Sequence, residues 1–341
     1  MSTTENNKKR VEISQIGKRN LLAKLFENKA FKNQNNIHLP HTVDSFPVDW
    51  TTTSGTLLEG VDFSLVYTPL KHLGYKAALS VIGKIYASGR TPYALSVVLG
   101  VSQKLYTDDI ENIWFGISAA AEEHGIKEVS LDLNPSLTGL CISLSAQGYI
   151  SCEDLKKVPA VSSSDIICIT GNLGAAYMGL HVLEREKAGF FKEASKQPDL
   201  TPYKYILSEY LSPFINKGLI SGLKENGIIP SSGYFITRGL ADTVKQIQQD
   251  SGFGVKIHVE RIPIAKQTFE MADEINIDAL TAAMNGGDDY RLLFTIPVDK
   301  FETLNKELQD IDTIGHLCAP EVGTQLVTPE GREIEIKAQG W

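Results

Sequence analysis

The sequence predicts a protein of mixed α/β or α+β class with about two domains. Its 341 residues, of which 42% are hydrophobic and 22% charged, are typical of a soluble chain of that size. Segments of strand and helix character follow one another in both halves. The hydrophobic pattern lapses into a polar connection over residues 148–164. We therefore expect one domain over residues 1–147 and a second over residues 148–341.

Hydrophobic periodicity orders the first half. In the helix at 73–87, Leu73, Ala77, Val81 and Ile85 recur at helical spacing, and the following Gly-Arg-Thr-Pro ends it. The expected elements are an amphipathic piece at 13–26, an exposed polar loop at 29–36, strands at 48–53 and 57–67, a helix at 73–87, a strand at 94–101, a helix at 108–124 and a strand pair within 128–145.

The second half begins with a buried strand at 165–170, followed by a turn at 171–174 and a helix at 175–187. Further helices are expected at 213–225, 240–249 and 269–274, and further strands at 255–259, 292–296, 313–317 and 333–338.

Composition excludes several classes of function. The net charge is −8, from 33 basic and 41 acidic residues, which disfavours nucleic-acid binding. No apolar run reaches the ~20 residues that a membrane span requires, and the first residues lack an apolar signal core, so we expect a cytoplasmic protein. The four cysteines are scattered without metal-ligand spacing, and no His-x-x-x-His pair occurs, so neither a disulfide framework nor a zinc site is indicated.

Two glycine-containing turns are candidate sites. Asn285-Gly-Gly-Asp-Asp289 precedes the apolar run Leu292–Ile296, which places two carboxylates at a strand entrance. That position suits a metal ion, a polar ligand or a helix cap, although a plain surface turn is the more frequent outcome. Gly171-Asn-Leu-Gly174, between a strand and a helix, has the form of a phosphate-binding turn or of an ordinary connection. Asp132, in an otherwise apolar strand, has either a partner or an edge position.

Seven ordered segments together resemble the thiamine-monophosphate kinases, within the superfamily of aminoimidazole-ribonucleotide-synthetase-like ATP-binding proteins. The segments extend over nearly the whole chain. They are Glu12-Ile-Ser, Leu58-Glu-Gly-Val-Asp-Phe63, Pro69-Leu-Lys-His-Leu-Gly-Tyr-Lys76, Thr170-Gly-Asn-Leu-Gly-Ala-Ala-Tyr-Met-Gly-Leu180, Arg261-Ile-Pro-Ile264, Asn285-Gly-Gly-Asp-Asp-Tyr290 and Ala338-Gln-Gly-Trp341.

The resemblance implies an N-terminal α/β domain that dimerises through its sheet and a C-terminal α+β domain. It also implies transfer of the γ-phosphoryl group of ATP to thiamine monophosphate, with several Mg²⁺ ions held by aspartates. On the acceptor side it implies substrate contacts at Asp62, Asp288 and Trp341. An acidic group beside an aromatic ring suits a thiazolium-like cation.

The metal side departs from the family pattern. The family's Gly-Asp-Asp-Ala-Ala stretch should fall between Asn36 and Trp50, where this chain has His38-Leu-Pro-His-Thr-Val-Asp-Ser-Phe46. An aspartate expected after the threonines is replaced by Gly55, and Ser-Asp becomes Gly83-Lys84. Gly-Gly-Asp becomes Ser130-Leu131-Asp132, and Asp-Ile-Ser-Asp-Gly-Leu becomes Phe235-Ile-Thr-Arg-Gly-Leu240.

These replacements leave Asp132 as the metal ligand that the resemblance implies, with Lys84, Leu131, Thr237 and Arg238 as nucleotide or phosphate contacts. Cations in place of aspartates repel Mg²⁺, while cationic side chains can hold phosphate directly. No catalytic residue is assigned.

We therefore expect a homodimer whose kinase activity is impaired and which retains small-ligand binding. The resemblance implies ATP and Mg²⁺, and the replaced aspartates argue against both. Two alternatives stay open. One is an active ATP-dependent kinase whose metal ligands have moved to other positions. The other is a non-catalytic partner that dimerises with an active relative.

Overall fold

The structure is a computed structural model that describes residues 10–190 and 199–338. Its contacts divide the chain into two compact units. Unit 1 comprises residues 1–39, 52–81 and 92–147, and unit 2 comprises residues 40–51, 82–91 and 148–341. The division into domains at residue 148 stays a prediction. No helix in the described part of the chain is long and apolar enough to cross a membrane.

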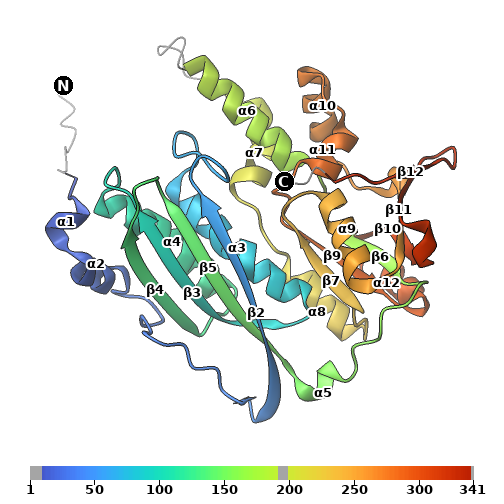
Figure 1. Cartoon of the computed structure of the whole chain (residues 1–341), viewed down its shortest axis with the longest axis horizontal. Helices are drawn as coiled ribbons and strands as arrows, with labels where there is room; N and C mark the ends of the chain where they lie inside the picture. Colours follow the sequence, from blue (N-terminus) through green and yellow to red (C-terminus); the bar gives the residue numbers. More distant parts are fainter. Residues whose placement is uncertain (1–9, 191–198, 339–341) are drawn as a thin grey trace. The chain divides into compact units, whose positions relative to one another are not determined.

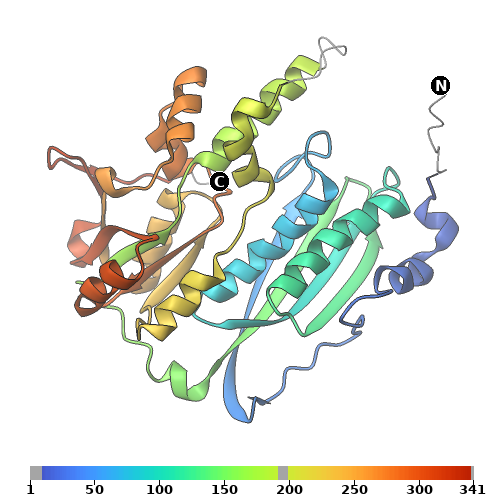
Figure 2. The ribbon, with the colours of Figure 1, turned by 180° about the vertical axis from the view of Figure 1, so that it is seen from behind.

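The first sheet has five strands in the order β1-β2-β5-β3-β4. Its strands are β1 (Thr42–Val43), β2 (Phe46–Leu58), β3 (Thr91–Val101), β4 (Glu128–Pro135) and β5 (Cys141–Ser151). Helices α3 (Leu70–Ala87) and α4 (Thr107–Glu123) lie along one face (Figure 2). Gly74 of α3 meets Ile113 of α4 so closely that a Cβ at position 74 would stand 2.0 Å from the Ile113 carbonyl oxygen.

The segment before β1 is tied to the outer strand β4. Two short helices, α1 (Ile13–Ile16) and α2 (Lys18–Leu25), are separated by Gly17, which has a φ of 77°. In the loop that follows them, the Asn33 amide donates to the Leu131 carbonyl at 3.1 Å and accepts from the Leu131 N–H at 2.8 Å. The loop expected to be freely exposed is therefore attached to the sheet.

The second sheet has seven strands in the order β12-β11-β8-β10-β6-β9-β7 (Figure 1). Its strands are β6 (Ile166–Thr170), β7 (Ser232–Ile236), β8 (Gly254–His258), β9 (Arg291–Ile296), β10 (Ile311–Cys318), β11 (Thr324–Val327) and β12 (Glu333–Glu335). The helices of unit 2 are α5 (Cys152–Leu155), α6 (Ala175–Phe190), α7 (Lys204–Leu211), α8 (Lys217–Glu225), α9 (Leu240–Ser251), α10 (Lys266–Ile275), α11 (Ala279–Asn285) and α12 (Phe301–Glu307).

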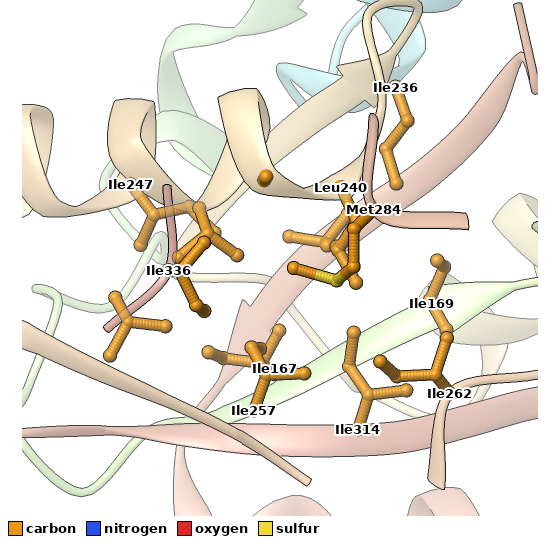
Figure 3. Close-up of a cluster of buried hydrophobic side chains, with 14 of the residues drawn as sticks. Ile167, Ile169, Ile236, Leu240, Ile247, Ile257, Ile262, Met284, Ile314 and Ile336 are labelled. Carbon is orange, nitrogen blue, oxygen red and sulfur yellow. The ribbon is translucent and has the colours of Figure 1, made fainter. Parts of the chain in front are cut away.

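Two apolar clusters hold this sheet. The larger one joins Ile167 of β6 and Ile257 of β8 to Leu240 and Ile247 of α9 (Figure 3). The second joins Phe294 of β9 to residues of α8 and α12. A buried aliphatic side chain contributes ~1.5–3 kcal/mol, so both faces of the central strands are strongly stabilised. Strand β9 is accordingly buried at every position, and β6 is buried at its three central positions.

Several sequence expectations were wrong in detail. Residues 61–67 form turns after β2, because the Asp62 carboxylate accepts the Leu58 N–H at 2.7 Å and closes a turn there. The pair expected within 128–145 is β4 and β5, but β3 lies between them in the sheet. The helix expected at 213–225 begins only at Lys217. Elements β7, β11, α7, α11 and α12 were not expected.

Candidate functional site

Strand register brings three connections of unit 2 together at one edge of the second sheet. Strand β9 pairs antiparallel with both β6 and β7, with Ile169 opposite Leu293 and Ile236 opposite Arg291. The ends of β6 and β7 therefore lie beside the start of β9. The loop after β6, the loop after β7 and the acidic turn before β9 meet at this edge, which places the candidate residues close together.

The acidic turn is fastened to the loop after β7 by its backbone. The Asp288 N–H donates to the Thr237 carbonyl at 2.9 Å, and the Tyr290 N–H donates to the Ile236 carbonyl at 2.9 Å. A Cβ at Gly287 would stand 3.0 Å from the same Thr237 oxygen. The predicted residues Thr237 and Asp288 are thus neighbours, and the Asp288 side chain is half-buried.

The second carboxylate of the turn caps a helix. Asp289 is 2% exposed, and its Oδ1 accepts the Gly174 N–H at 2.8 Å, immediately before α6 begins at Ala175. A carboxyl oxygen at a helix N-terminus satisfies a free N–H group. The turn at Gly171–Gly174 is therefore capped by a side chain of the protein itself, and the helix-cap interpretation holds for Asp289.

Lys84 and Arg238 also belong to this part of unit 2. Gly83 meets the Phe235 ring, and a Cβ there would stand 2.2 Å from Phe235 Cζ, so the end of α3 lies against β7. Lys84 follows on α3 and Arg238 follows β7. Burial lowers the pKa of Lys84, and the positive charge of Arg238 lowers it further. The two cations are near enough to repel each other, Lys84 being half-buried and Arg238 exposed.

A buried ion pair, which sequence reasoning missed, lies beside the acidic turn. Arg291 of β9 pairs with Glu209 of α7, with side chains 8% and 13% exposed. The Arg291 Nε also donates to the Asn172 carbonyl at 3.1 Å. The two residues are 82 positions apart in the chain, so the pattern of neighbouring residues in the sequence could not predict that they pair.

The other predicted residues lie in unit 1 and are described separately. Asp62 is exposed, and its carboxylate closes the turn after β2. Leu131 is buried within β4, where its backbone pairs with Asn33. Asp132 forms an ion pair with Lys18 at 2.5 Å, which lowers the pKa of its carboxyl. Asp132 thus has the partner that a carboxylate in an apolar strand requires. Trp341 lies outside the described residues.

The described residues do not fit a family-type magnesium site. They contain no group of three or more His, Cys, Asp or Glu side chains placed to hold a metal ion. In unit 2 the predicted contacts comprise two cations, one hydroxyl group and the Asp288 carboxylate. Mg²⁺ requires oxygen ligands, and an adjacent ammonium or guanidinium group opposes its binding.

Two cavities are present in the described part of the chain. One, of about 840 Å³ in unit 2, is bordered by Asn172, Arg261 and Asp312 among others. The other, of about 300 Å³ in unit 1, is lined by serines of the first sheet, including Ser96 and Ser143. Asn172 belongs to the candidate turn at 171–174, but none of the individual ligand or metal contacts predicted from the sequence lines either cavity.

The sequence of this chain is similar to those of known proteins. Residues 47–150 match the family "AIR synthase related protein, N-terminal domain". The thiamine-monophosphate kinase of Buchnera aphidicola (subsp. Schizaphis graminum) is 28% identical over 298 residues, which cover 85% of each chain. That of Aquifex aeolicus is 23% identical over 337 residues, covering 97% of this chain and 98% of the relative.

Solved structures share the fold. The thiamine-monophosphate kinase of Aquifex aeolicus superposes with a TM-score of 0.69 at 20% identity, covering 95% of this chain and all of that chain. A second structure of similar likeness is AaThiL complexed with AMPPCP and TMP. Escherichia coli HypE, a hydrogenase maturation protein, superposes with a TM-score of 0.67 at 16% identity and covers 94% of this chain and 95% of that chain. In sequence and fold this chain is thus similar to the thiamine-monophosphate kinases, and its residues 47–150 match the N-terminal domain of the AIR synthase-related proteins.

Proposed function

We propose that this chain binds a phosphorylated small ligand of the thiamine-monophosphate type and has lost most of the metal-dependent kinase activity of its relatives. The proposal depends on one observation: Lys84 and Arg238 of unit 2 lie close enough for the charge of Arg238 to lower the pKa of Lys84. In the family pattern these positions hold aspartates. Two cations there favour phosphate and disfavour Mg²⁺.

The start of α9 supports phosphate binding at the same place. This helix has twelve residues, and its N-cap, Gly239, provides no side-chain hydrogen bond to the first turn. Arg238 directly precedes the cap, and backbone N–H groups at a helix start attract anions. A bound phosphate would also relieve the repulsion between Lys84 and Arg238. We therefore assign Lys84, Thr237 and Arg238 to phosphate binding. Leu131 is a proposed nucleotide contact on the resemblance alone, since its backbone N–H already pairs with Asn33.

The acceptor side is proposed to use acidic and aromatic groups. Asp288 is half-buried at the edge of the second sheet, where a carboxylate can attract a cationic ring. Asp62 and Trp341 remain proposed substrate contacts that rest on the resemblance, and Asp132 remains a proposed metal ligand on the same basis.

Turnover and nucleotide binding test the proposal together. We expect ADP release with ATP, Mg²⁺ and thiamine monophosphate far below the ~1–100 per second typical of kinases. Calorimetry should give the same affinity for ATP with Mg²⁺ as with EDTA. Turnover in the usual kinase range, or ATP binding only with Mg²⁺, would support the alternative of an active kinase with relocated metal ligands.

A variant series locates the phosphate contacts. Arg238→Ala and Lys84→Ala should each weaken ATP binding at least tenfold, because each removes a charge-assisted contact worth ~1.5–3 kcal/mol. Arg185→Ala is the matched control, since Arg185 is a cation of unit 2 that pairs with Glu274 at 2.6 Å. Unchanged affinity in both site variants would contradict the assignment.

We further propose that the protein is a cytoplasmic homodimer formed through the first sheet. Support comes from the sheet face that bears the serine-lined cavity, where Val98 is 40% exposed in the middle of β3. Light scattering at micromolar concentration should give twice the chain mass, and Val98→Lys should give the monomer. If the chain alone is monomeric, and if it forms a complex with an active kinase when the two are purified together, the alternative of a non-catalytic partner gains support.

A further inference from the structure

The Asp289 carboxyl group is buried with only half of its hydrogen-bonding capacity used. Its Oδ1 accepts the Gly174 N–H, whereas its Oδ2 has no hydrogen-bond partner among the described residues. Asp165, another buried aspartate of unit 2, differs in this respect, because its Oδ2 accepts from the Ser162 N–H and the Ser231 hydroxyl. A buried oxygen without a partner is unusual and points to a role other than packing.

The charges around Asp289 do not balance when every group is ionised. Arg291 is the cation facing it, and this guanidinium already pairs with Glu209 and with the Asn172 carbonyl. Asp288 on the turn and Glu209 on α7 add negative charge, and the Tyr205 hydroxyl of α7 lies in the same neighbourhood. The Asp289 and Glu209 carboxylates thus share one guanidinium, with Asp288 adding a further negative charge, an arrangement that one bound proton relieves.

Burial is the main reason why Asp289 holds a proton. It raises the pKa of Asp289 to about 8, against the opposing effects of the Gly174 N–H and of Arg291. A neutral carboxyl with an unused O–H is far less costly to bury than an unpaired carboxylate.

The turn that buries Asp289 is strained. Gly287, Asp288 and Tyr290 have φ values of 78°, 60° and 53°, so Asp289 is flanked by two non-glycine residues in the left-handed region. Such residues prefer other conformations, and strain of this kind persists only when surrounding contacts enforce it. The contacts on this turn include the two backbone hydrogen bonds to Ile236 and Thr237, together with the Asp289 cap on Gly174.

We propose that Asp289 is a positioning residue whose proton keeps the acidic turn closed, and that opening of the turn releases this proton as the carboxylate reaches water. Closure holds Asp288 beside Thr237 and keeps the Gly174 N–H capped. Protonation of Asp289 therefore regulates the ligand site that contains Asp288 and Thr237. This effect on the ligand site rests on the proposed function, whereas closure of the turn does not.

Hydrogen exchange of the ligand-free full chain tests the coupling. Exchange rates of peptides covering 171–180 and 285–292 are corrected for intrinsic exchange at each pH. Because the closed form binds one more proton than the open form, protection should fall about tenfold per pH unit between about pH 6 and 8 and level off above. A flat profile over this range would overturn the proposal.

Two buried aspartates provide matched variants. Asp289→Asn keeps an oxygen for the Gly174 N–H but cannot ionise, so its protection should be independent of pH. Asp165→Asn should retain the slope of the unmodified chain, since Asp165 lies outside the turn and is 1% exposed. A slope that survives in Asp289→Asn, or that disappears in Asp165→Asn, would contradict the assignment.

A second measurement needs no variant. In protein labelled with ¹³C at aspartate carboxyls, one resonance should titrate near pH 8 and show proximity to the Gly174 amide. If every aspartate carboxyl titrates below about pH 6, Asp289 does not hold the proton. Neither measurement uses nucleotide, so failure of the proposed ligand binding would leave this result unaffected.

Discussion

Gly83 of α3 packs against the aromatic ring of Phe235 on β7, and no room is left there for a side chain at position 83. A Cβ at Gly83 would stand 2.2 Å from Phe235 Cζ. The Phe235 ring is itself held by an edge-to-face contact with Tyr290, with centroids 5.5 Å apart. The glycine thus fixes the helix end that carries Lys84 against the strand that leads to Thr237 and Arg238.

Gly83→Ala should destabilise the protein by about 1–3 kcal/mol, because the added methyl group forces the Phe235 ring out of its position. Urea unfolding followed by circular dichroism measures the change. Gly189→Ala is the control, since Gly189 lies in α6 with nothing within 4 Å of the added Cβ. That control should stabilise by ~0.5–1 kcal/mol through helix propensity. Equal effects of both variants would show that Gly83 is not under packing constraint.

Removing one member of the buried pair Arg291–Glu209 should cost ~3–5 kcal/mol, because the remaining charge is left buried without its partner. Arg291→Met and Glu209→Gln test the two members, and the double variant should recover part of the loss. Lys266→Met removes a pair whose side chains are 85% and 58% exposed and should change stability by less than ~1 kcal/mol. Additive losses in the double variant would argue against direct coupling.

His316 should make the fold sensitive to mild acid. Burial lowers the pKa of His316, and His258, Lys256 and Arg261 lower it further. In the unfolded chain its pKa returns to ~6.5, so below that pH the unfolded state binds more protons and stability falls until the folded-state pKa is reached.

His316→Gln should lessen this decline below about pH 6.5, as measured by thermal unfolding in matched buffers. His72→Gln changes an exposed histidine of α3 and should leave the decline in place. The slope from Asp289 has the opposite sign, because stability there is lost as the pH rises towards about 8. A decline that is unchanged in His316→Gln would exclude this residue as its source.

The hairpin between β1 and β2 has no glycine where its geometry favours one. Asp44 and Ser45 form its two-residue loop with φ values of 48° and 70°. Ser45→Gly should therefore raise the free energy of unfolding by ~0.5 kcal/mol, because glycine adopts positive φ without steric cost. The same change at Ser54, an extended residue of β2, should lower it by a similar amount. A loss at both positions would refute the conformational argument.

Elements with strong periodicity were predictable from the sequence. The helix expected at 73–87 is α3, and the buried strands expected at 165–170 and 292–296 are β6 and β9, each within a few residues. Their apolar residues repeat over enough positions to outweigh local ambiguity. Strand β7 was missed because it is short and contains Gly233. Only glycine fits at this position, because a Cβ there would stand 2.0 Å from the Ala87 carbonyl oxygen.

The site was only partly predictable. The resemblance implied ligand contacts at Lys84, Thr237, Arg238 and Asp288, and these residues all belong to unit 2, while their roles stay predictions. It could not foresee that Asp289 is buried, because its partner Gly174 is 115 residues away and a carboxylate in a glycine turn is usually exposed. The strand expected over residues 61–67 failed for a related reason, since one side-chain hydrogen bond from Asp62 outweighs the alternating pattern.

Strand β4 is an outer strand of the first sheet, and its backbone groups would invite pairing with another polypeptide. Asn33 occupies both hydrogen-bonding groups of Leu131, and the Gln34 N–H donates to the Val129 carbonyl at 2.9 Å. The N-terminal segment therefore covers backbone groups of β4 that could otherwise pair with another molecule. Deleting this segment should lower the solubility of the protein before it changes ligand binding.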